Sequence, residues 1–194
     1  LTFVDYKSLI YVFILFSLVS SLVYVFNDLI DQDSDSNHPI KKDKPLPKKE
    51  ITLFETLLVI SFIIVIFLAL SLSTTINNEN IFIIVSYLLL SILYSLLLKK
   101  IIIVDVLLVS VFYVLRVKCG VNEINESISN LIYLQIYFAS IFILFCKRYS
   151  DLNYTINLKS ITNIYDKKSE ILKLLINLLL LVNIIIYLLI IINF

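Results

Sequence analysis

Long apolar blocks alternate with short polar segments along this chain, and the pattern predicts helices that cross a membrane. The blocks are Leu9–Phe26, Leu53–Ser73, Ile81–Leu98, Ile102–Val117, Leu131–Phe145 and Ile171–Ile192. A helix crosses a bilayer with roughly 20 apolar residues, and backbone inside lipid must satisfy its own hydrogen bonds, which a helix does. The many Ile and Val residues, which favour strands in water, do not change this expectation. We predict an all-α, polytopic transmembrane bundle that forms a single domain over residues 1–194.

Composition supports a membrane protein and argues against a protein that binds nucleic acid. Of the 194 residues, 60% are hydrophobic, and the mean hydropathy is +0.98. A soluble domain is nearer half apolar. The net charge is only +1, whereas a nucleic-acid-binding surface carries a clear excess of Lys and Arg. We therefore expect a chain embedded in lipid, with no nucleic-acid partner.

The distribution of basic residues predicts which side of the membrane each loop faces. If the six spans alternate, segments 27–50, 99–100 and 147–170 share one side, and they hold twelve of the 16 Lys and Arg residues. The opposite loops, 74–80 and 121–130, hold no Lys or Arg. Because cytoplasmic loops are enriched in Lys and Arg, we predict a multi-pass protein of the cell membrane with the first set of segments in the cytoplasm.

Three aspartates follow the first apolar block at a helical spacing. Asp28, Asp31 and Asp35 stand at positions i, i+3 and i+7, so they share one face if the helix continues past Phe26. Asn27 lies on the same side, one turn before Asp31. Carboxylates this close repel one another unless a cation lies between them, and Mg²⁺ is a natural one because it prefers oxygen ligands. The alternative is an acidic segment exposed to solvent, without a ligand.

Several lysines come directly after the aspartates, within the same Asp/Lys-rich segment 27–50. Lys41, Lys42 and Lys44 could hold the phosphates of a diphosphate while the metal holds its other side. The dipeptide His38–Pro39 predicts a turn that ends the helix and directs the lysines back over it. We predict that segment 27–50 forms a cytoplasmic active-site segment.

Two further charged clusters lie at later helix ends. Lys99 precedes the fourth block, and Asp105 and Arg116 lie inside it. An ionisable residue in an apolar span usually faces the interior of the bundle, although a long side chain can also reach the membrane surface. Lys147 and Arg148 follow the fifth block, where they either bind phosphate or anchor the helix end at the interface.

These motifs resemble those of the UbiA superfamily of intramembrane prenyltransferases. Its first aspartate motif, N-D-x-x-D-x-x-x-D, is matched in full at Asn27, Asp28, Asp31 and Asp35. The superfamily folds as about nine helices around a central cavity that opens laterally to lipid. With about six of nine spans present, the resemblance implies that this chain is part of a longer bundle.

Within the superfamily, the later motifs resemble the decaprenyl-phosphate phosphoribosyltransferase branch. The matching patterns are D-x-x-x-D-x-x-H-P-x-K-x-x-K-P over 31–45, Y-S-x-x-L-K-x-x-x-x-x-D over 94–105, L-R at 115–116 and K-R-Y-x-D-L over 147–152. The chain departs from that branch at Lys44, where Arg is usual, and near Lys49, where Gly is usual. Val109 stands where aromatic prenyltransferases often carry a second Asp, which favours the phosphoribosyl branch.

The resemblance implies a Mg²⁺-dependent transferase that moves phosphoribose from phosphoribosyl diphosphate to a polyprenyl phosphate in the membrane. Asp28, Asp31 and Asp35 would hold Mg²⁺ as catalytic residues, and Asp105 would contact the ribose or the metal. The diphosphate leaves during the reaction, and basic groups would stabilise its charge. The implied substrate-binding residues are Asn27, Lys41, Lys44, Lys99, Arg116, Lys147 and Arg148.

Two other interpretations remain open at the level of the sequence. In the first, the same site holds a prenyl diphosphate, and the enzyme transfers the prenyl group to an aromatic or other lipid acceptor. In the second, which belongs to another class, the chain is a non-catalytic membrane remnant or a transporter-like bundle. Transporters more often carry Gly or Pro within broken helices, and the predicted spans contain neither.

Overall fold

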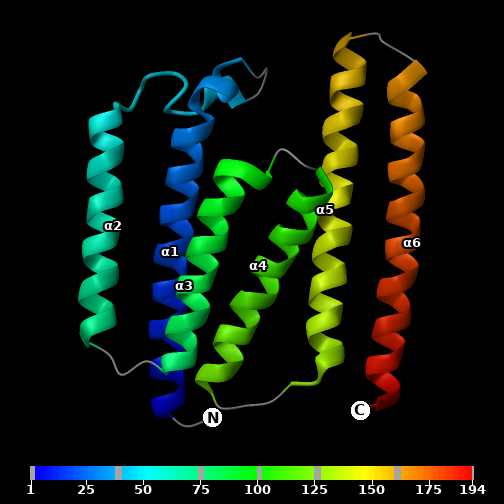
Figure 1. The fold of residues 1–194 in the computed structure, drawn as a ribbon. Helices are drawn as coiled ribbons and strands as arrows, with labels where there is room; N and C mark the ends of the chain where they lie inside the picture. The colour runs from blue at the N-terminus through cyan, green and yellow to red at the C-terminus, as the bar shows by residue number, and fades with distance from the viewer. Residues whose placement is uncertain are drawn as a thin grey trace. The chain divides into compact units, whose positions relative to one another are not determined.

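The computed structural model describes residues 3–37, 41–73, 77–99, 102–124, 128–159 and 163–193, and within these it describes no side chains for 3–5, 73, 102 and 151–168. Most of the described residues are helical and none lies in a strand, which confirms the all-α prediction (Figure 1). The elements in chain order are α1 (Phe3–Ser36), the 3₁₀-helix η1 (Lys41–Asp43), α2 (Leu53–Ser73), α3 (Asn78–Leu93), the π-helix η2 (Tyr94–Leu98), α4 (Ile102–Glu123), α5 (Asn130–Lys159) and α6 (Asn163–Asn193).

Five of these helices are long and apolar enough to cross a membrane. Their spans are Tyr6–Ser36, Leu53–Leu72, Asn78–Leu98, Asn130–Ser150 and Ser169–Asn193. The remaining predicted span is confirmed as a helix, α4, but it carries Asp105, Arg116, Lys118 and Glu123 and is not among the five. The chain is therefore a multi-pass helical membrane protein, and α4 is the predicted span that falls outside these five helices.

Helix starts are explained by local capping. Thr52 and Glu55 form a capping box at the start of α2: the Thr52 amide donates to Glu55 Oε2 at 2.7 Å, and the Glu55 amide donates to Thr52 Oγ1 at 3.3 Å. Asn77 caps α3 by accepting from the Glu79 amide at 3.1 Å. These side chains satisfy backbone donors that the first turn of a helix leaves without partners.

The first compact unit comprises residues 1–100 and 116–126. In it, α1 packs against α2 and α3. Leu15, Phe16 and Val19 are buried on α1, and the Phe16 ring lies 4.7 Å from the Tyr87 ring of α3. At 34 residues, α1 is about 51 Å long, whereas a bilayer core is about 30 Å thick. One end of α1 must therefore extend beyond the lipid, and that end can carry polar residues.

The second compact unit comprises residues 101–115 and 127–194. Here α5 and α6 run along each other (Figure 1). Its core contains Val106 of α4, Ile141 and Phe145 of α5 and Leu179 of α6. One polar contact crosses between α5 and α6, where Gln135 Nε2 donates to Asn183 Oδ1 at 3.1 Å. Such side-chain amide bonds between helices are typical of membrane bundles.

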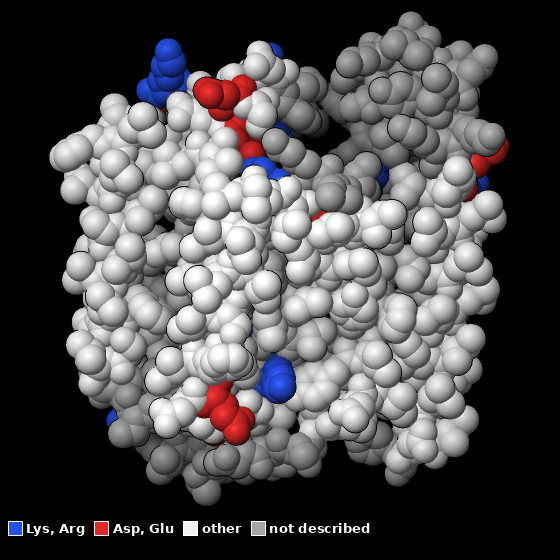
Figure 2. Space-filling model, viewed as in Figure 1, with Lys and Arg blue, Asp and Glu red and all other residues white. Residues whose placement is uncertain are grey.

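The outer walls of the helices are apolar. Phe54, Phe62 and Leu72 of α2 and Leu174 and Ile192 of α6 are all more than half exposed. On the face drawn in Figure 2, the charged side chains of the described residues gather near helix ends and leave the helix walls white. A water-soluble protein does not expose apolar surface on this scale, so these walls are suited to lipid.

The lysine-rich segment after η1 ends in a Schellman motif. The Glu50 amide donates to the Pro45 carbonyl and the Lys49 amide donates to the Leu46 carbonyl, both at 3.0 Å. Lys49 has a φ of 60°, which is a left-handed conformation that costs a side-chain-bearing residue about 1–2 kcal/mol. The turn fixes the backbone on which Lys44 stands.

Because Gly adopts this conformation without steric cost, we expect Lys49→Gly to raise the free energy of unfolding by about 0.5–1 kcal/mol. Denaturant unfolding of the purified protein in detergent measures the change. Lys48→Gly is the matched control in the same turn, and it should destabilise. A Lys49→Gly protein no more stable than the parent would contradict this account of the turn.

Candidate active site

The aspartate motif lies on the last three turns of α1. The helix continues past Phe26 to Ser36, as expected, so Asp28, Asp31 and Asp35 lie on one face of one helix. They differ in exposure: Asp35 is buried, with 4% of its surface exposed, whereas Asp28 and Asp31 are partly exposed. A buried carboxylate requires a charged or hydrogen-bonding partner, and the structure supplies one.

Lys44 bridges two of the three carboxylates. Its ammonium donates to Asp28 Oδ1 at 2.6 Å and to Asp35 Oδ2 at 2.8 Å. The ammonium of Lys41 lies 3.7 Å from the other oxygen of Asp35. The lysines therefore fold back over the end of α1, as predicted, although His38 and Pro39 of the predicted turn lie outside the described residues.

These contacts keep Lys44 positively charged. Partial burial by itself lowers the pKa of the Lys44 ammonium, but hydrogen bonds and charge attraction from Asp28 and Asp35 outweigh burial and raise the pKa above its ordinary value. The ammonium therefore stays protonated throughout the physiological pH range. Its stabilising contribution is complete at neutral pH and is lost only as strongly alkaline pH deprotonates it.

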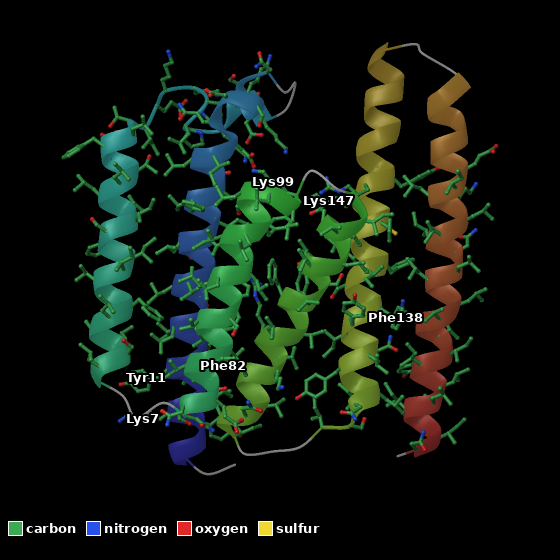
Figure 3. All side chains as sticks on the ribbon, viewed as in Figure 1. Lys7, Tyr11, Phe82, Lys99, Phe138 and Lys147 are labelled. Atoms are coloured by element: carbon green, nitrogen blue, oxygen red, sulfur yellow. The ribbon has the colours of Figure 1, made fainter. Side chains whose placement is uncertain are left out.

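The third carboxylate, that of Asp31, pairs with Lys99, which follows the π-helix η2. The Lys99 ammonium donates to Asp31 Oδ1 and lies 3.4 Å from Asn27 Oδ1. Figure 3 labels Lys99 at the upper end of the ribbon that contains α3 and η2. Lys99 directly follows η2, where its amide donates to the Tyr94 carbonyl at 3.1 Å. A π-turn holds one more residue than an α-turn, so it changes the direction in which Lys99 leaves the helix. Sequence periodicity gave no signal for this turn.

The donor set suits a magnesium ion bound together with a substrate phosphate. Among the described residues, no group of three or more acidic, His or Cys side chains is gathered closely enough to hold a metal. Asp28 and Asp35 nevertheless place one oxygen each around a single cation, the Lys44 ammonium. Mg²⁺ commonly takes one or two carboxylates and completes its shell with water and phosphate oxygens. The chemistry of the pair is compatible with that mode, and the role of Asp28, Asp31 and Asp35 as metal ligands stays a prediction.

In the second unit, Asp105 of α4 pairs with Arg148 of α5. Asp105 is buried, and its carboxylate accepts a hydrogen bond from the Arg148 guanidinium. Asp105 therefore faces a neighbouring helix, as expected for an ionisable residue in a span. Lys147, the residue next to Arg148, is exposed. Of these two basic residues, Arg148 is the one that pairs with Asp105 of α4.

Arg116 lies among polar and aromatic groups of the first unit. Its guanidinium donates to Ser20 Oγ of α1 and to the Tyr87 hydroxyl of α3, both at 3.2 Å. It also lies over the rings of Phe16 and Tyr87, at 5.8 and 5.7 Å from their centres. These partners come from two other helices, and no sequence pattern pointed to them.

The comparisons with known proteins agree with the motif. The model described as the UbiA prenyltransferase family matches residues 2–194. Two decaprenyl-phosphate phosphoribosyltransferases of Mycobacterium tuberculosis, from strains CDC 1551 / Oshkosh and ATCC 25618 / H37Rv, are each 29% identical to the chain over 141 residues. The alignment covers 73% of this chain and 46% of each relative. The chain thus spans about half the length of the curated relatives it matches.

We expect Arg148→Met to lower the free energy of unfolding by about 1–3 kcal/mol, because it removes a partner of the buried Asp105 carboxylate. Lys147→Met, the control at the adjacent exposed position, should change it by less than about 0.5 kcal/mol. Denaturant unfolding in detergent makes the comparison.

The double variant Asp105→Leu with Arg148→Met should be more stable than Arg148→Met alone, because no buried charge remains. If the two single variants at 147 and 148 lose equal stability, or the double variant recovers nothing, the ion pair does not have this structural role.

Proposed function

Because this chain belongs to the UbiA prenyltransferase family, we propose that it transfers phosphoribose from phosphoribosyl diphosphate to a polyprenyl phosphate in the membrane and releases diphosphate. The name that the two mycobacterial relatives carry, decaprenyl-phosphate phosphoribosyltransferase, supports this choice of donor and acceptor.

The observation that carries the proposal is the alternation of carboxylates and ammonium groups at the end of α1. Asp28 and Asp35 share Lys44, and Asp31 pairs with Lys99. A diphosphate bound with a divalent cation needs both kinds of group within one site, since carboxylates hold the cation and ammonium groups hold phosphate oxygens. An acidic segment exposed to solvent would not need lysines from two other segments.

The reaction follows from these charges. An oxygen of the polyprenyl phosphate attacks the anomeric carbon of the ribose, the bond from that carbon to the diphosphate breaks, and the diphosphate leaves with the bonding electrons. Mg²⁺, held by Asp28 and Asp35, would supply positive charge to the leaving group. Lys44, Lys41 and Lys99 would stabilise the same developing charge, and fixed charges of this kind lower barriers most where water is excluded.

The membrane geometry fits a lipid acceptor and a water-soluble donor. The aspartates lie on the part of α1 that extends past its apolar block, and the apolar helix walls can lie against a polyprenyl tail. We propose that segment 27–50 faces the cytoplasm of the cell membrane, because twelve of the 16 basic residues fall in segments on that side.

A second candidate reaction uses the same site with a different donor. The family is described as prenyltransferases, so a prenyl diphosphate could be the molecule whose diphosphate binds at Asp28 and Asp35. The prenyl group would then pass to an aromatic or other lipid acceptor, and the leaving group would again be diphosphate. An assay that supplies labelled phosphoribosyl diphosphate or labelled prenyl diphosphate in turn distinguishes the two reactions.

We expect the purified full-length protein to move label from phosphoribosyl diphosphate into the lipid fraction when decaprenyl phosphate and Mg²⁺ are present. Asp31→Asn should lower the rate by about a hundredfold or more while membrane insertion is unchanged. Lys48→Ala is the control, because Lys48 pairs with Asp43 and Glu50 and should retain activity.

Label that enters lipid only from a prenyl diphosphate would establish the second candidate in place of the first. Transfer from neither donor would indicate a non-catalytic protein. An active Asp31→Asn enzyme would exclude Asp31 from the site.

A further inference from the structure

Lys44 lies between Asp28 and Asp35, the two carboxylates that we propose hold a metal ion. Its nitrogen lies 2.6 Å from one carboxylate and 2.8 Å from the other, so each carboxylate already directs an oxygen at a shared cation. Lys99 differs, because its carboxylate contact is with Asp31 alone and its second contact is the neutral Asn27. Among the described residues, Lys44 is the ammonium that bridges two carboxylates of the motif.

We propose that the Lys44 ammonium acts as the counter-ion of Asp28 and Asp35 and prevents divalent cations from binding to this pair until a diphosphate binds. This inference rests on the proposed function of the pair as a metal-diphosphate site. A divalent cation can take the two oxygens only when the ammonium leaves them. A diphosphate gives the departing ammonium a new anionic partner, so binding of the cation and binding of the diphosphate favour each other.

The side chain of Lys44 can make this exchange without movement of its backbone. The Lys44 amide donates to the Lys41 carbonyl at 3.0 Å, and its carbonyl accepts from the Lys48 amide at 3.1 Å. The side chain itself is 37% exposed and has a flexible four-carbon stem. A rotation of the side chain therefore moves the ammonium from the carboxylates towards a phosphate bound above them.

The pair keeps a neighbouring positive charge when Lys44 leaves. Lys41 lies 3.7 Å from Asp35 Oδ1, which is the oxygen that Lys44 does not contact. Burial of Asp35 makes its charge costly without a cation, so the position between the carboxylates is occupied either by Lys44 or by a metal. The enzyme is thereby protected from binding a metal ion without its substrate.

The test measures Mn²⁺ binding by electron paramagnetic resonance, with and without inorganic pyrophosphate, on the full-length protein in detergent. For the parent protein we expect weak binding of Mn²⁺ alone and tight binding of Mn²⁺ with pyrophosphate. Lys44→Met should bind Mn²⁺ alone about tenfold more tightly than the parent, and pyrophosphate should enhance its Mn²⁺ binding about tenfold less, within the usual range of coupling between sites.

Three variants complete the design. Lys44→Arg keeps a cation at the position and should behave as the parent does, and Lys48→Met, which removes an exposed lysine of the same turn, should also match the parent. Asp28→Asn should weaken Mn²⁺ binding. If Lys44→Met binds Mn²⁺ alone no more tightly than the parent, or if Asp28→Asn leaves binding unchanged, the inference is overturned.

These outcomes are separate from those of the transfer assay. Mn²⁺ and pyrophosphate report on the Asp28–Asp35 pair whichever donor carries the diphosphate. The predicted Mn²⁺ pattern in a protein that transfers no phosphoribose would support the counter-ion role and reject the proposed reaction. Phosphoribosyl transfer, together with a Mn²⁺ affinity of Lys44→Met equal to that of the parent, would support the proposed reaction and reject the counter-ion role.

Discussion

The end of α1 depends on the neutralisation of three carboxylates that one helical face brings together. Two like charges 4 Å apart repel by about 4 kcal/mol at the effective dielectric constant of a protein surface, and Asp35 is buried. Lys44 and Lys41 from the segment after α1, and Lys99 from the end of η2, supply the opposing charge. Without these lysines the last turns of α1 would carry uncompensated charge beside a membrane.

Two features of the neighbouring backbone position those lysines. The Schellman motif at Pro45–Glu50 fixes the turn in which Lys44 stands, and it does so at the cost of a left-handed Lys49. The π-turn η2 changes the direction of the chain just before Lys99. Both features are locally unfavourable or uncommon, and each lies close in sequence to a lysine that contacts the aspartate motif. Local strain at functional segments is a familiar pattern.

The sequence predicted the helices and the face that carries the motif, because hydropathy blocks and helical spacing are properties of single segments. The spacing of the aspartates predicted that α1 continues past its apolar block, but the apolar blocks underestimated the later helices, since α5 extends to Lys159 and α6 begins at Asn163. Polar turns outside the lipid leave no hydropathy signal.

The partners of the site residues were harder to predict. Asp105 pairs with Arg148, and Arg116 contacts Ser20 and Tyr87, and these contacts depend on which helices are neighbours and on their rotation. No periodicity within one helix contains that information. The sequence did predict that the lysines return over the end of α1, although the turn predicted at His38–Pro39 lies outside the described residues.

The central claim is that one cation position between Asp28 and Asp35 is shared in turn by Lys44 and a divalent metal. A structure determined with Mn²⁺ and pyrophosphate, in which anomalous scattering locates the manganese, tests it most directly. The account predicts Mn²⁺ in contact with oxygens of both aspartates and the Lys44 ammonium against a phosphate oxygen. Manganese and pyrophosphate bound while Lys44 still bridges the two carboxylates would contradict it.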